Sequence, residues 1–308
     1  MTNLFKGDCL IESDKIESGS VDLILTDLPY GNMNTDGGRK LGINGWDLAI
    51  DPKKVYEIAN RILRKNGKMI LFSQEPYTTR LITEQAANIP FNYRATWEKD
   101  NFAVALGAAV NMVNYYEDVL VFSKRDETIL KHPLRTYAKK IVDYIGLKQV
   151  EIQNRIQTGK IHFLGAEKST QFSLLQSKVY DKLIEVFGID KIQGFKEFAE
   201  LKEIDNEFKK KFASTFNLWE GNKYKSNILK YKKDYDGHHP TQKPILLLED
   251  LIKTFSNEND LVVDLTMGSG STGVAAKNTN RNFIGIEQDE SYFNIAQQRI
   301  NETEYKLF

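Results

Sequence analysis

A glycine-rich loop at residues 266–273 constrains the fold of this chain more than its other motifs do. The loop follows the apolar, β-branched run 261–265, and its three glycines have the spacing G-x-G-x-x-G. A helix with small residues begins directly after it, near Val274. A strand, a glycine turn and a helix in this order let the backbone approach a ligand in an α/β fold with a parallel sheet. The loop therefore predicts a nucleotide-like cofactor at the carboxyl edge of such a sheet.

Two acids flank the glycine loop and favour one class of cofactor. Asp264 ends the strand before the loop, and Glu287 ends the next strand, 282–286, about 19 residues beyond Gly268. An acid at the second position commonly holds ribose hydroxyls. A carboxylate at the first position would repel the pyrophosphate of NAD, and it suits a cation such as the ammonium of S-adenosylmethionine. Because one strand and one helix follow, no nicotinamide half is expected. The plainer alternative is that both acids cap strand ends.

A second apolar strand, 21–25, ends in the motif Asp27–Leu28–Pro29–Tyr30. Proline fixes its own φ and holds the preceding residue extended, so an acid, a carbonyl and a ring can face one small pocket. The Asp27 carboxylate and the Leu28 carbonyl are a pair of acceptors suited to an exocyclic amino group. The Tyr30 ring can stack on a planar heterocycle. The alternative interpretation is a tight turn after a strand.

Strands and helices alternate on both sides of a long central segment. A helix that begins at Asp51 is expected to end at Gly67. The region from residue 31 to residue 45, rich in Gly, Asn and Asp, is expected to be a mobile loop beside the pocket. This order predicts one half of a doubly wound sheet before the central segment. The stretch 4–9 is expected to be a short strand that ends in a Gly-Asp turn, and the other expected strands are 21–25, 68–72, 93–97, 118–122, 261–265 and 282–286.

The central segment, 124–235, differs from both flanks in pattern and in charge. Strand patterns are absent from it, and helical patterns appear. It carries 23 Lys+Arg against 15 Asp+Glu, whereas the whole chain balances 42 against 42. Basic and aromatic residues alternate near its end, which favours nucleic-acid binding, with a solvated helical insert as the alternative. The expected phosphate contacts are Tyr224, Lys225, Lys230, Lys232 and Lys233.

The residue counts exclude several classes of protein. With 308 residues, 41% of them hydrophobic, the chain can bury a sizeable core. Its single cysteine, Cys9, allows no internal disulfide, and with four histidines it cannot readily build a zinc site. No apolar run approaches the roughly 20 residues of a membrane span, and no signal-peptide pattern is present. We therefore expect a soluble, cytoplasmic protein with no metal and no membrane partner.

Together these motifs resemble those of the DNA amino-methyltransferases, which modify adenine N6 or cytosine N4. The motif at 27–30 is similar to their catalytic motif, and the glycine loop is similar to their cofactor motif. The strand that ends at Glu287 resembles their ribose-binding strand. The stretch His239–Pro240–Thr241–Gln242–Lys243–Pro244 resembles a segment that these enzymes place before the cofactor motif. With the catalytic half first, the order looks like that of the β group, and roughly residues 3–123 and 237–300 are covered.

The resemblance implies a Rossmann-like, doubly wound, mostly parallel sheet with an antiparallel strand, circularly permuted, and a mainly helical inserted target-recognition domain. It divides the chain into a catalytic half at 1–123, the insert at 124–235 and a cofactor-binding half at 236–308. The implied catalytic residues are Asp27, Leu28, Pro29 and Tyr30. The implied cofactor-binding residues are Asp8, Asp27, Gln242, Lys243, Asp264, Thr266, Gly268, Ser269, Gly270 and Glu287.

The implied activity is transfer of a methyl group from S-adenosylmethionine to adenine N6 of a base flipped out of double-stranded DNA, as in restriction–modification. Aspartate in the first motif position favours adenine within the family, and cytosine N4 is the alternative. Leu28 departs from the usual D-P-P-Y, but the base acceptor there is the backbone carbonyl. Enzymes of this group often pair, so a homodimer is expected, associated with the nucleoid when bound to DNA.

Two hypotheses from other classes compete with this interpretation. The first is a methyltransferase acting on RNA or on protein glutamine, in which the cofactor motif normally precedes the catalytic one. The order here is the opposite. The second is a DNA-binding protein that has lost catalysis, which the intact Asp27, Pro29, Tyr30 and Asp264 disfavour.

Overall fold

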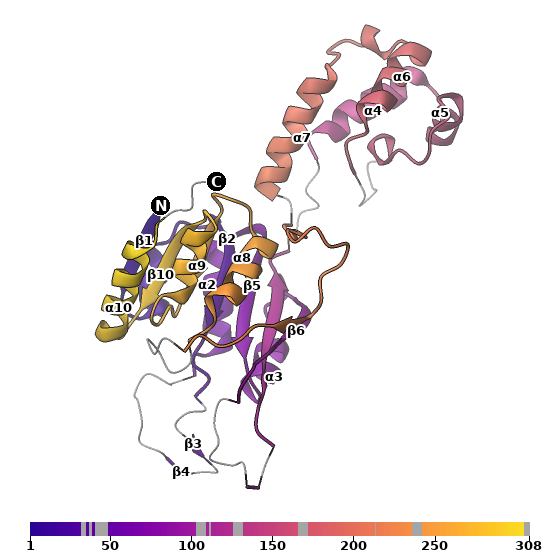
Figure 1. Ribbon diagram of the computed structural model, residues 1–308. Coiled ribbons are helices and arrows are strands. Elements are labelled where there is room, and N and C mark those ends of the chain that lie inside the picture. Colours follow the sequence, from indigo (N-terminus) through magenta and orange to yellow (C-terminus); the bar gives the residue numbers. More distant parts are fainter. Residues whose placement is uncertain are drawn as a thin grey trace. The chain divides into compact units, whose positions relative to one another are not determined.

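The chain forms two compact units, each with its own core. The computed structural model describes residues 1–31, 35–36, 39–40, 49–102, 109–110, 112–125, 132–165, 172–212, 214–235 and 242–304. Unit 1 consists of Met1–Arg125 with Ser214–Phe308, and unit 2 is Asp126–Ala213 (Figure 1). The stretch 214–235, which the sequence assigned to the insert, therefore belongs to unit 1. The reason is a short strand within it, β8 (Ile228–Lys230), that pairs with the main sheet.

Unit 1 is built on an eight-stranded sheet in which parallel pairing dominates. Its other strands are β1 (Thr2–Lys6), β2 (Val21–Asp27), β5 (Leu63–Ser73), β6 (Phe91–Glu98), β7 (Tyr116–Ser123), β9 (Leu261–Asp264) and β10 (Asn282–Glu287). Their order is β1-β10-β9-β2-β5-β7-β6-β8. Both pairings of β7 are antiparallel and the others are parallel, so β7 alone runs in the reverse direction among these eight strands. The predicted mostly parallel sheet with an antiparallel strand is confirmed.

Helices cover both faces of this sheet (Figure 1). Alternate residues of a strand point to opposite faces, so Ile24 of β2 belongs to one apolar core, and Leu23 and Leu25 belong to the other. The first core includes residues of α1 (Cys9–Glu12), α2 (Pro52–Ile62) and α3 (Tyr77–Thr83). The second includes residues of α8 (Ile245–Phe255), α9 (Ser271–Asn278) and α10 (Glu290–Glu302). The three layers are those of a doubly wound α/β fold, as predicted.

The predicted end of the helix that begins after Asp51 was wrong. Asp51 caps α2 as expected, because its side chain accepts a hydrogen bond from the backbone N–H of Lys53. The helix ends at Ile62, however, and Gly67 lies inside β5. There the pairing of β5 with β2 shifts register, and a Cβ on Gly67 would lie 3.0 Å from the carbonyl oxygen of Arg64. The glycine therefore serves a close backbone approach in a bulge and not a helix cap.

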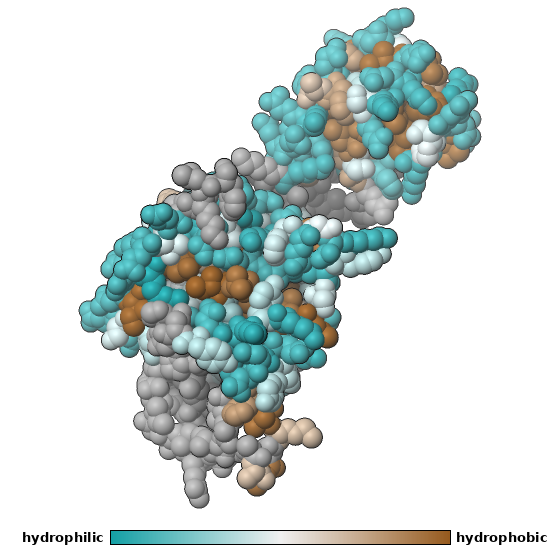
Figure 2. Space-filling model, viewed as in Figure 1, coloured by the Kyte–Doolittle hydropathy of each residue, from teal (hydrophilic) through white to brown (hydrophobic). Residues whose placement is uncertain are grey.

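Unit 2 is helical in its described residues. It contains α4 (Leu134–Ile145), α5 (Gln149–Arg155), α6 (Ser177–Phe187) and α7 (Phe198–Phe212), with short 3₁₀ turns at His162–Leu164 and Ile189–Lys191. Gly146 and Gly188 end α4 and α6 in the left-handed conformation. Its apolar core is separate from both cores of unit 1. On the face drawn in Figure 2, hydrophilic side chains cover much of unit 2, with apolar ones between them. The helical character predicted for the insert is confirmed for these residues, whereas its last part, 214–235, contains β8 and belongs to unit 1.

Three smaller elements complete the described part of the fold. A 3₁₀ turn at Ser13–Lys15 follows α1, and β3 (Thr35–Asp36) pairs antiparallel with β4 (Arg39–Lys40). Most of the predicted loop between residues 31 and 45, and residues 239–241 of the predicted motif before α8, lie outside the described residues. No helix among the residues described is long and apolar enough to cross a bilayer.

Candidate active site

The two halves of the sequence meet where β2 and β9 lie side by side. Hydroxyl groups join the ends of these strands. Thr26 Oγ1 of β2 donates to Asp264 Oδ1 of β9 over 2.8 Å, and Thr266 Oγ1 donates to the carbonyl oxygen of Asp27 over 2.9 Å. β10 neighbours β9 and ends at Glu287. The sheet thus brings Asp27, Asp264 and Glu287 to one carboxyl edge, where an α/β fold binds its ligands.

The glycine loop follows β9 and leads into α9, as predicted, but the helix begins at Ser271, three residues earlier than expected. Gly268 and Gly270 have φ angles of 51° and 85°, a region that favours glycine. A Cβ on Gly270 would also lie 2.8 Å from the Cβ of Ala296 in α10. The backbone conformation and the close approach of α10 therefore both require glycine at position 270.

Glu287 is held by the backbone and lies beside the start of α1. Its Oε2 accepts from the backbone N–H of Gly268 over 2.9 Å, and its Oε1 accepts from that of Asp289 over 2.8 Å. Burial raises the pKa of the Glu287 carboxyl above its usual value. Asp8 caps α1 by accepting from the backbone N–H of Leu10. Burial, Asp8 and Glu287 raise the pKa of the Cys9 thiol to about 12, so Cys9 stays a neutral core residue.

Asp264 is buried, with a relative exposure of 3%, and neutral groups hold it. Besides the Thr26 hydroxyl, the backbone N–H of Thr266 donates to its Oδ1 over 3.1 Å. Burial raises the pKa of this carboxyl to about 6. Asp264 therefore orders the edge between β2 and β9, and its predicted contact with a cofactor stays a prediction.

Arg299 organises the glycine loop, which the sequence did not indicate. Its guanidinium, on α10, donates to the Ser269 carbonyl over 2.7 Å and to Ser271 Oγ over 3.3 Å. The Ser269 hydroxyl in turn donates to Gln242 Oε1 over 3.2 Å. Gln242 and Ser269, both predicted to bind the cofactor, thus lie together. The sequence could not predict this role of Arg299, because an arginine on an amphipathic helix is usually a solvated residue.

Asp27 accepts hydrogen bonds on both carboxylate oxygens. The Tyr30 hydroxyl donates to Oδ1 over 2.5 Å, and the Lys243 ammonium donates to Oδ2. Burial raises the pKa of the Asp27 carboxyl, and the neighbouring ammonium opposes this effect. The Tyr30 ring lies 6.0 Å from the ring of Tyr77, centroid to centroid. Leu28 is 2% exposed, so its side chain packs in the core and only its backbone can serve a ligand.

Lys243 contacts acids, although the sequence grouped it with the cofactor residues. Besides Asp27, its Nζ lies 3.2 Å from Glu117 Oε2. Glu117 pairs in turn with Lys99, Nζ to Oε1 2.8 Å. Glu117 and Lys99 were not identified from the sequence, because they lie in strand and loop segments with no motif around them. The pairing depends on β7 running antiparallel, which brings the amino end of β7 to the carboxyl edge of its neighbours.

The five residues predicted to contact phosphates differ in their freedom to do so. Tyr224, Lys230 and Lys232 are exposed, and the Lys230 ammonium lies 3.4 Å from Glu98 Oε2 in a pair that faces solvent. The Lys225 ammonium lies 2.5 Å from Asp250 Oδ1. The Lys233 ammonium donates to the carbonyl oxygen of Phe102 over 3.0 Å, and burial lowers the pKa of Lys233. We therefore keep the first three as proposed DNA contacts and withdraw the last two, whose ammonium groups are held by a buried carboxylate and by a backbone carbonyl of unit 1.

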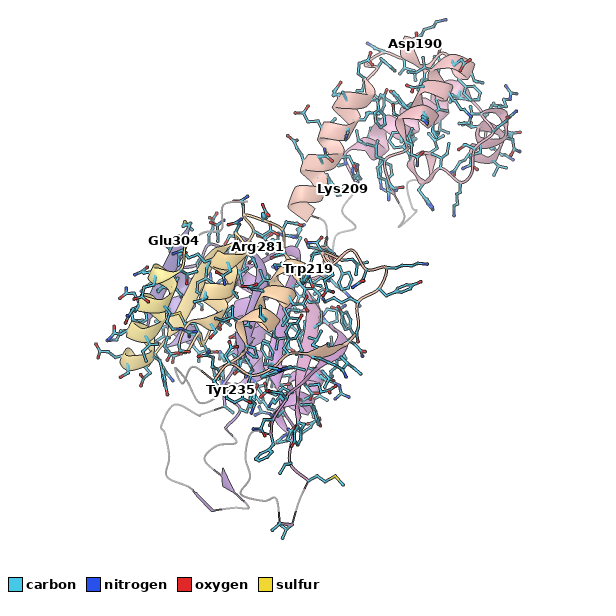
Figure 3. All side chains as sticks on the ribbon, viewed as in Figure 1. Asp190, Lys209, Trp219, Tyr235, Arg281 and Glu304 are labelled. Carbon is cyan, nitrogen blue, oxygen red and sulfur yellow. The ribbon has the colours of Figure 1, made fainter. Side chains whose placement is uncertain are left out.

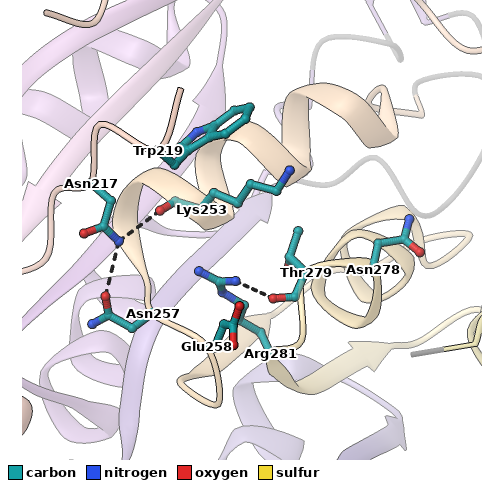
Figure 4. Close-up of a pocket in the computed structure, with 8 residues that line it drawn as sticks. All are labelled: Asn217, Trp219, Lys253, Asn257, Glu258, Asn278, Thr279 and Arg281. Atoms are coloured by element: carbon teal, nitrogen blue, oxygen red, sulfur yellow. Dashed lines mark hydrogen bonds between the residues drawn. The ribbon is translucent and has the colours of Figure 1, made fainter. Parts of the chain in front are cut away.

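A separate hollow of about 400 Å³ lies at the opposite edge of unit 1 (Figure 4). Lys253 of the last turn of α8, Asn257 before β9 and Arg281 before β10 place it at the amino ends of the strands. The Trp219 ring covers it, with the Lys253 ammonium 4.3 Å from a ring centroid. Trp219 and Arg281, both in unit 1, are also labelled in Figure 3. The residues that line the hollow are Asn217, Trp219, Lys253, Asn257, Glu258, Asn278, Thr279 and Arg281. None of the residues predicted for catalysis or cofactor binding lines this hollow.

Across the described residues, no three His, Cys, Asp or Glu side chains come together to hold a metal ion. The acids at the carboxyl edge are instead paired with lysines or hydrogen-bonded to hydroxyl and backbone N–H groups.

Comparison with known proteins gives one family and several relatives. A family model described as DNA methylase, of the N6/N4 type, matches residues 21–298. The type II methyltransferase M2.LlaDCHI of Lactococcus lactis subsp. cremoris is 25% identical over 303 residues, 94% of this chain and 85% of the relative. The DNA adenine methyltransferase YhdJ of Escherichia coli K12 is 25% identical over 304 residues, 97% and 82% of the two chains. The crystal structure of an M1.HpyAVI–SAM complex superposes with a TM-score of 0.54 at 20% identity, covering 98% of this chain and 100% of that one.

Proposed function

The chain belongs to the DNA methylase family of the N6/N4 type, and we propose that it transfers a methyl group from S-adenosylmethionine to N6 of adenine in double-stranded DNA. One observation carries this proposal. The Asp27 motif and the glycine loop, more than 230 residues apart in sequence, are joined through the hydrogen bond from Thr266 Oγ1 to the Asp27 carbonyl oxygen. A methyl donor and a methyl acceptor can therefore meet at one edge of the sheet.

The chemistry of the cofactor half fits S-adenosylmethionine. Glu287 ends β10 with its carboxylate fixed by two backbone N–H groups, which leaves further acceptor sites on both oxygens for ribose hydroxyls. Asp264 adds a second acid, so the local charge favours a cation over the pyrophosphate of a dinucleotide. Gln242, Ser269 and the loop glycines would hold the rest. When bound, the cofactor supplies an electrophilic methyl group on a sulfonium.

The catalytic half would hold the amino group of a flipped base. The lone pair of adenine N6 is delocalised into the ring, so the amine is a poor nucleophile. The Asp27 carboxylate and the Leu28 carbonyl would accept its two hydrogens and favour tetrahedral character at nitrogen. Tyr30 would stack on the ring, and Pro29 fixes the turn. A bond would form between N6 and the methyl carbon as the carbon–sulfur bond breaks, and N6 would lose one proton to solvent. Positioning and electrostatics supply most of the acceleration.

Two observations favour adenine over cytosine as the target base: the identity of the first motif residue and the name of one relative. Asp27 stands where aspartate favours adenine within the family, and YhdJ carries the name of an adenine methyltransferase. Cytosine N4 is the alternative, because it presents the same exocyclic amine and the family covers both reactions.

Recognition of DNA is proposed for two parts of the chain. Unit 2 would read the target sequence, and the exposed Tyr224, Lys230 and Lys232 of unit 1 would contact phosphates. Unit 2 carries 16 Lys+Arg against 13 Asp+Glu, so the basic excess of the segment 124–235 is not concentrated in it. A homodimer and a role in restriction–modification are further proposals from the family.

Base identification after methylation tests the function. The protein is incubated with S-adenosylmethionine labelled in the methyl group and with unmethylated genomic DNA, which is then digested to nucleosides and analysed by mass spectrometry. Labelled N6-methyldeoxyadenosine is the expected product. Labelled N4-methyldeoxycytidine would replace the adenine proposal by the alternative, and the absence of label from DNA with label on RNA or protein would contradict both.

A further inference from the structure

Four charged side chains of alternating sign lie in a row along the carboxyl edge of the unit 1 sheet, and the proposed reaction uses only the first. Asp27 ends β2, Lys243 precedes α8, Glu117 lies in β7 and Lys99 follows β6. The Lys243 ammonium donates to Asp27 Oδ2 and lies 3.2 Å from Glu117 Oε2. Lys99 Nζ lies 2.8 Å from Glu117 Oε1. With all four ionised, the row is neutral.

Stability alone does not account for this row. The side chains of Lys243 and Lys99 are 6% and 2% exposed, whereas that of Asp27 is 25% exposed. Each ammonium also lies over an aromatic ring, Lys243 over Phe72 at 5.1 Å and Lys99 over Trp97 at 5.2 Å. Burying ions costs solvation free energy that apolar side chains of similar volume would not incur. Asp27 is the member of the row that solvent reaches most easily, so the function of the row should concern Asp27.

We propose that Lys243 and Glu117 are positioning residues for Asp27. Lys243 keeps the Asp27 carboxylate ionised and turned towards the base, and Glu117, anchored by Lys99, holds Lys243 in place. This inference rests on the proposed function, because it gives Asp27 the task of accepting the amino group of the base. It moves Lys243 from the cofactor side of the site to the base side.

The charges that face Asp27 act on its carboxyl with different signs. Burial raises the pKa of Asp27, the Lys243 ammonium lowers it, and the Glu117 carboxylate raises it. The Tyr30 hydroxyl lowers it by donating a hydrogen bond, and Asp264 of β9 is a further acidic neighbour. Removing the charge of Lys243 must therefore raise the pKa of Asp27, and removing the charge of Glu117 must lower it. The amide oxygen of a glutamine at position 117 can still accept from the Lys243 ammonium, so Glu117→Gln removes the charge without releasing Lys243.

The test compares Lys243→Met with Glu117→Gln, each of which removes one charge; the second keeps the side-chain length, and the first shortens it by one atom. The pKa of Asp27 is measured by ¹³C NMR on the full chain labelled at aspartate carboxyl carbons, with the Asp27 signal assigned from Asp27→Asn. Lys243→Met is expected to raise this pKa by at least about one unit, and Glu117→Gln is expected to lower it. The acid limb of the pH profile of methyl transfer should move in the same two directions.

A matched control lies at the other end of β2. Arg64→Met removes the cation that pairs with Asp22, a partly buried ion pair at the amino end of the strand. Its effect on thermal stability should be similar in kind, but the pKa of Asp27 should not change. A shift in Arg64→Met as large as that in Lys243→Met would mean that general destabilisation, and not the row, moves the titration.

The outcomes separate this inference from the proposed function. Shifts of the same sign in both variants, or no shift in either, would overturn the positioning role even if the wild type methylates DNA. If Lys243→Met does not fold, Glu117→Gln decides alone, because an unchanged or raised pKa of Asp27 contradicts the proposal. A wild type that methylates no base would overturn the proposed function, while the NMR titration would still read the coupling within the row.

Discussion

The acids of the two halves of the carboxyl edge are stabilised by different kinds of partner. In the cofactor half, Asp264 and Glu287 accept hydrogen bonds from neutral hydroxyl and backbone N–H groups. In the catalytic half, Asp27 and Glu117 are paired with the ammonium groups of Lys243 and Lys99. Among the residues that the structure describes, no cation pairs with the acids of the first half, whereas those of the second are paired with lysines.

This difference matches the charges of the two proposed ligands. A sulfonium cofactor with an ammonium group gains Coulomb energy from acids that no cation has already neutralised. A flipped base is neutral, so a net charge beside it would add desolvation cost without a partner. What the base needs is an oriented acceptor, which a lysine-held carboxylate provides. One sheet edge can thus bind a cation and a neutral ring side by side.

The largest expected effect is the loss of methyl transfer on Asp27→Ala. The variant removes an acceptor that the proposed mechanism uses to orient the amino group, so turnover should fall by at least about 10²–10³-fold. Radiolabel transfer to DNA measures it, and the melting temperature checks that the fold persists. The Lys243 ammonium keeps Glu117 as a partner, so the variant leaves no unpaired cation. Near-normal turnover would remove Asp27 from the mechanism.

Glu287→Ala should have the next largest effect, and on the cofactor. Hydrogen bonds to a charged group contribute about 1.5–3 kcal/mol, so losing those to the ribose predicts roughly 10- to 100-fold weaker binding of S-adenosylmethionine. Isothermal titration calorimetry gives the affinity. Glu290→Ala is a matched control, because Glu290 lies on the first turn of α10 and pairs with the exposed Lys6. Equal losses in both variants would contradict the assignment.

A smaller effect is expected from lowering the pH, which should weaken cofactor binding by protonating Asp264. The pKa of this carboxyl is raised to about 6, so it is ionised above that pH and protonated below it. A cationic ligand binds the ionised form, so its affinity should be complete near neutral pH and fall by up to about tenfold as the pH drops from about 6 to about 5. Calorimetry at several pH values measures this. The variant Asp264→Asn should bind more weakly near neutral pH and show little pH dependence; a slope as steep as that of the wild type would assign the effect to another group.

The raised pKa of Asp264 also makes the stability of the folded protein depend on pH. A carboxyl whose pKa is higher in the folded chain than in the unfolded chain favours folding when it is protonated. Its ionisation therefore costs stability as the pH rises through about 6. The cofactor-free protein should gain stability from this group on mild acidification, in the same pH range in which it loses cofactor affinity.

The smallest effect is expected from the exposed lysines at the end of β8. Replacing Lys230 and Lys232 together by alanine should weaken binding to all DNA sequences alike and flatten the salt slope by up to about two units, without changing cofactor affinity. Fluorescence titration at several salt concentrations measures the slope. Lys53 and Lys54, exposed at the start of α2, provide a control pair with the same change in charge. Equal slopes in the two double variants would mean that Lys230 and Lys232 only face solvent.

The sequence predicted the local parts of this edge and missed the parts that depend on distant pairing. The strand before Asp27 and the glycine loop carry their signals within a few residues, because turn geometry and strand pattern are local. The contact between Lys243 and Glu117 joins segments 126 positions apart through an antiparallel strand, so no spacing rule reaches it. Gly67 misled partly for the same reason, because a Cβ there would approach the Asp22 carbonyl of β2 (3.2 Å) as well as that of Arg64. Lys225 was taken for a surface cation, since its partner Asp250 lies on α8.

The division of the edge into a cofactor half and a base half is tested most directly by the affinity of Asp27→Ala for S-adenosylmethionine. Asp27 stands among the residues that the resemblance gave to both tasks, and the structure ties it to Lys243 and Tyr30. Isothermal titration calorimetry without DNA should give a dissociation constant within about twofold of the wild type, in a variant that no longer transfers methyl groups. A loss of affinity as large as that of Glu287→Ala would show that the two halves are not separate and would contradict the account.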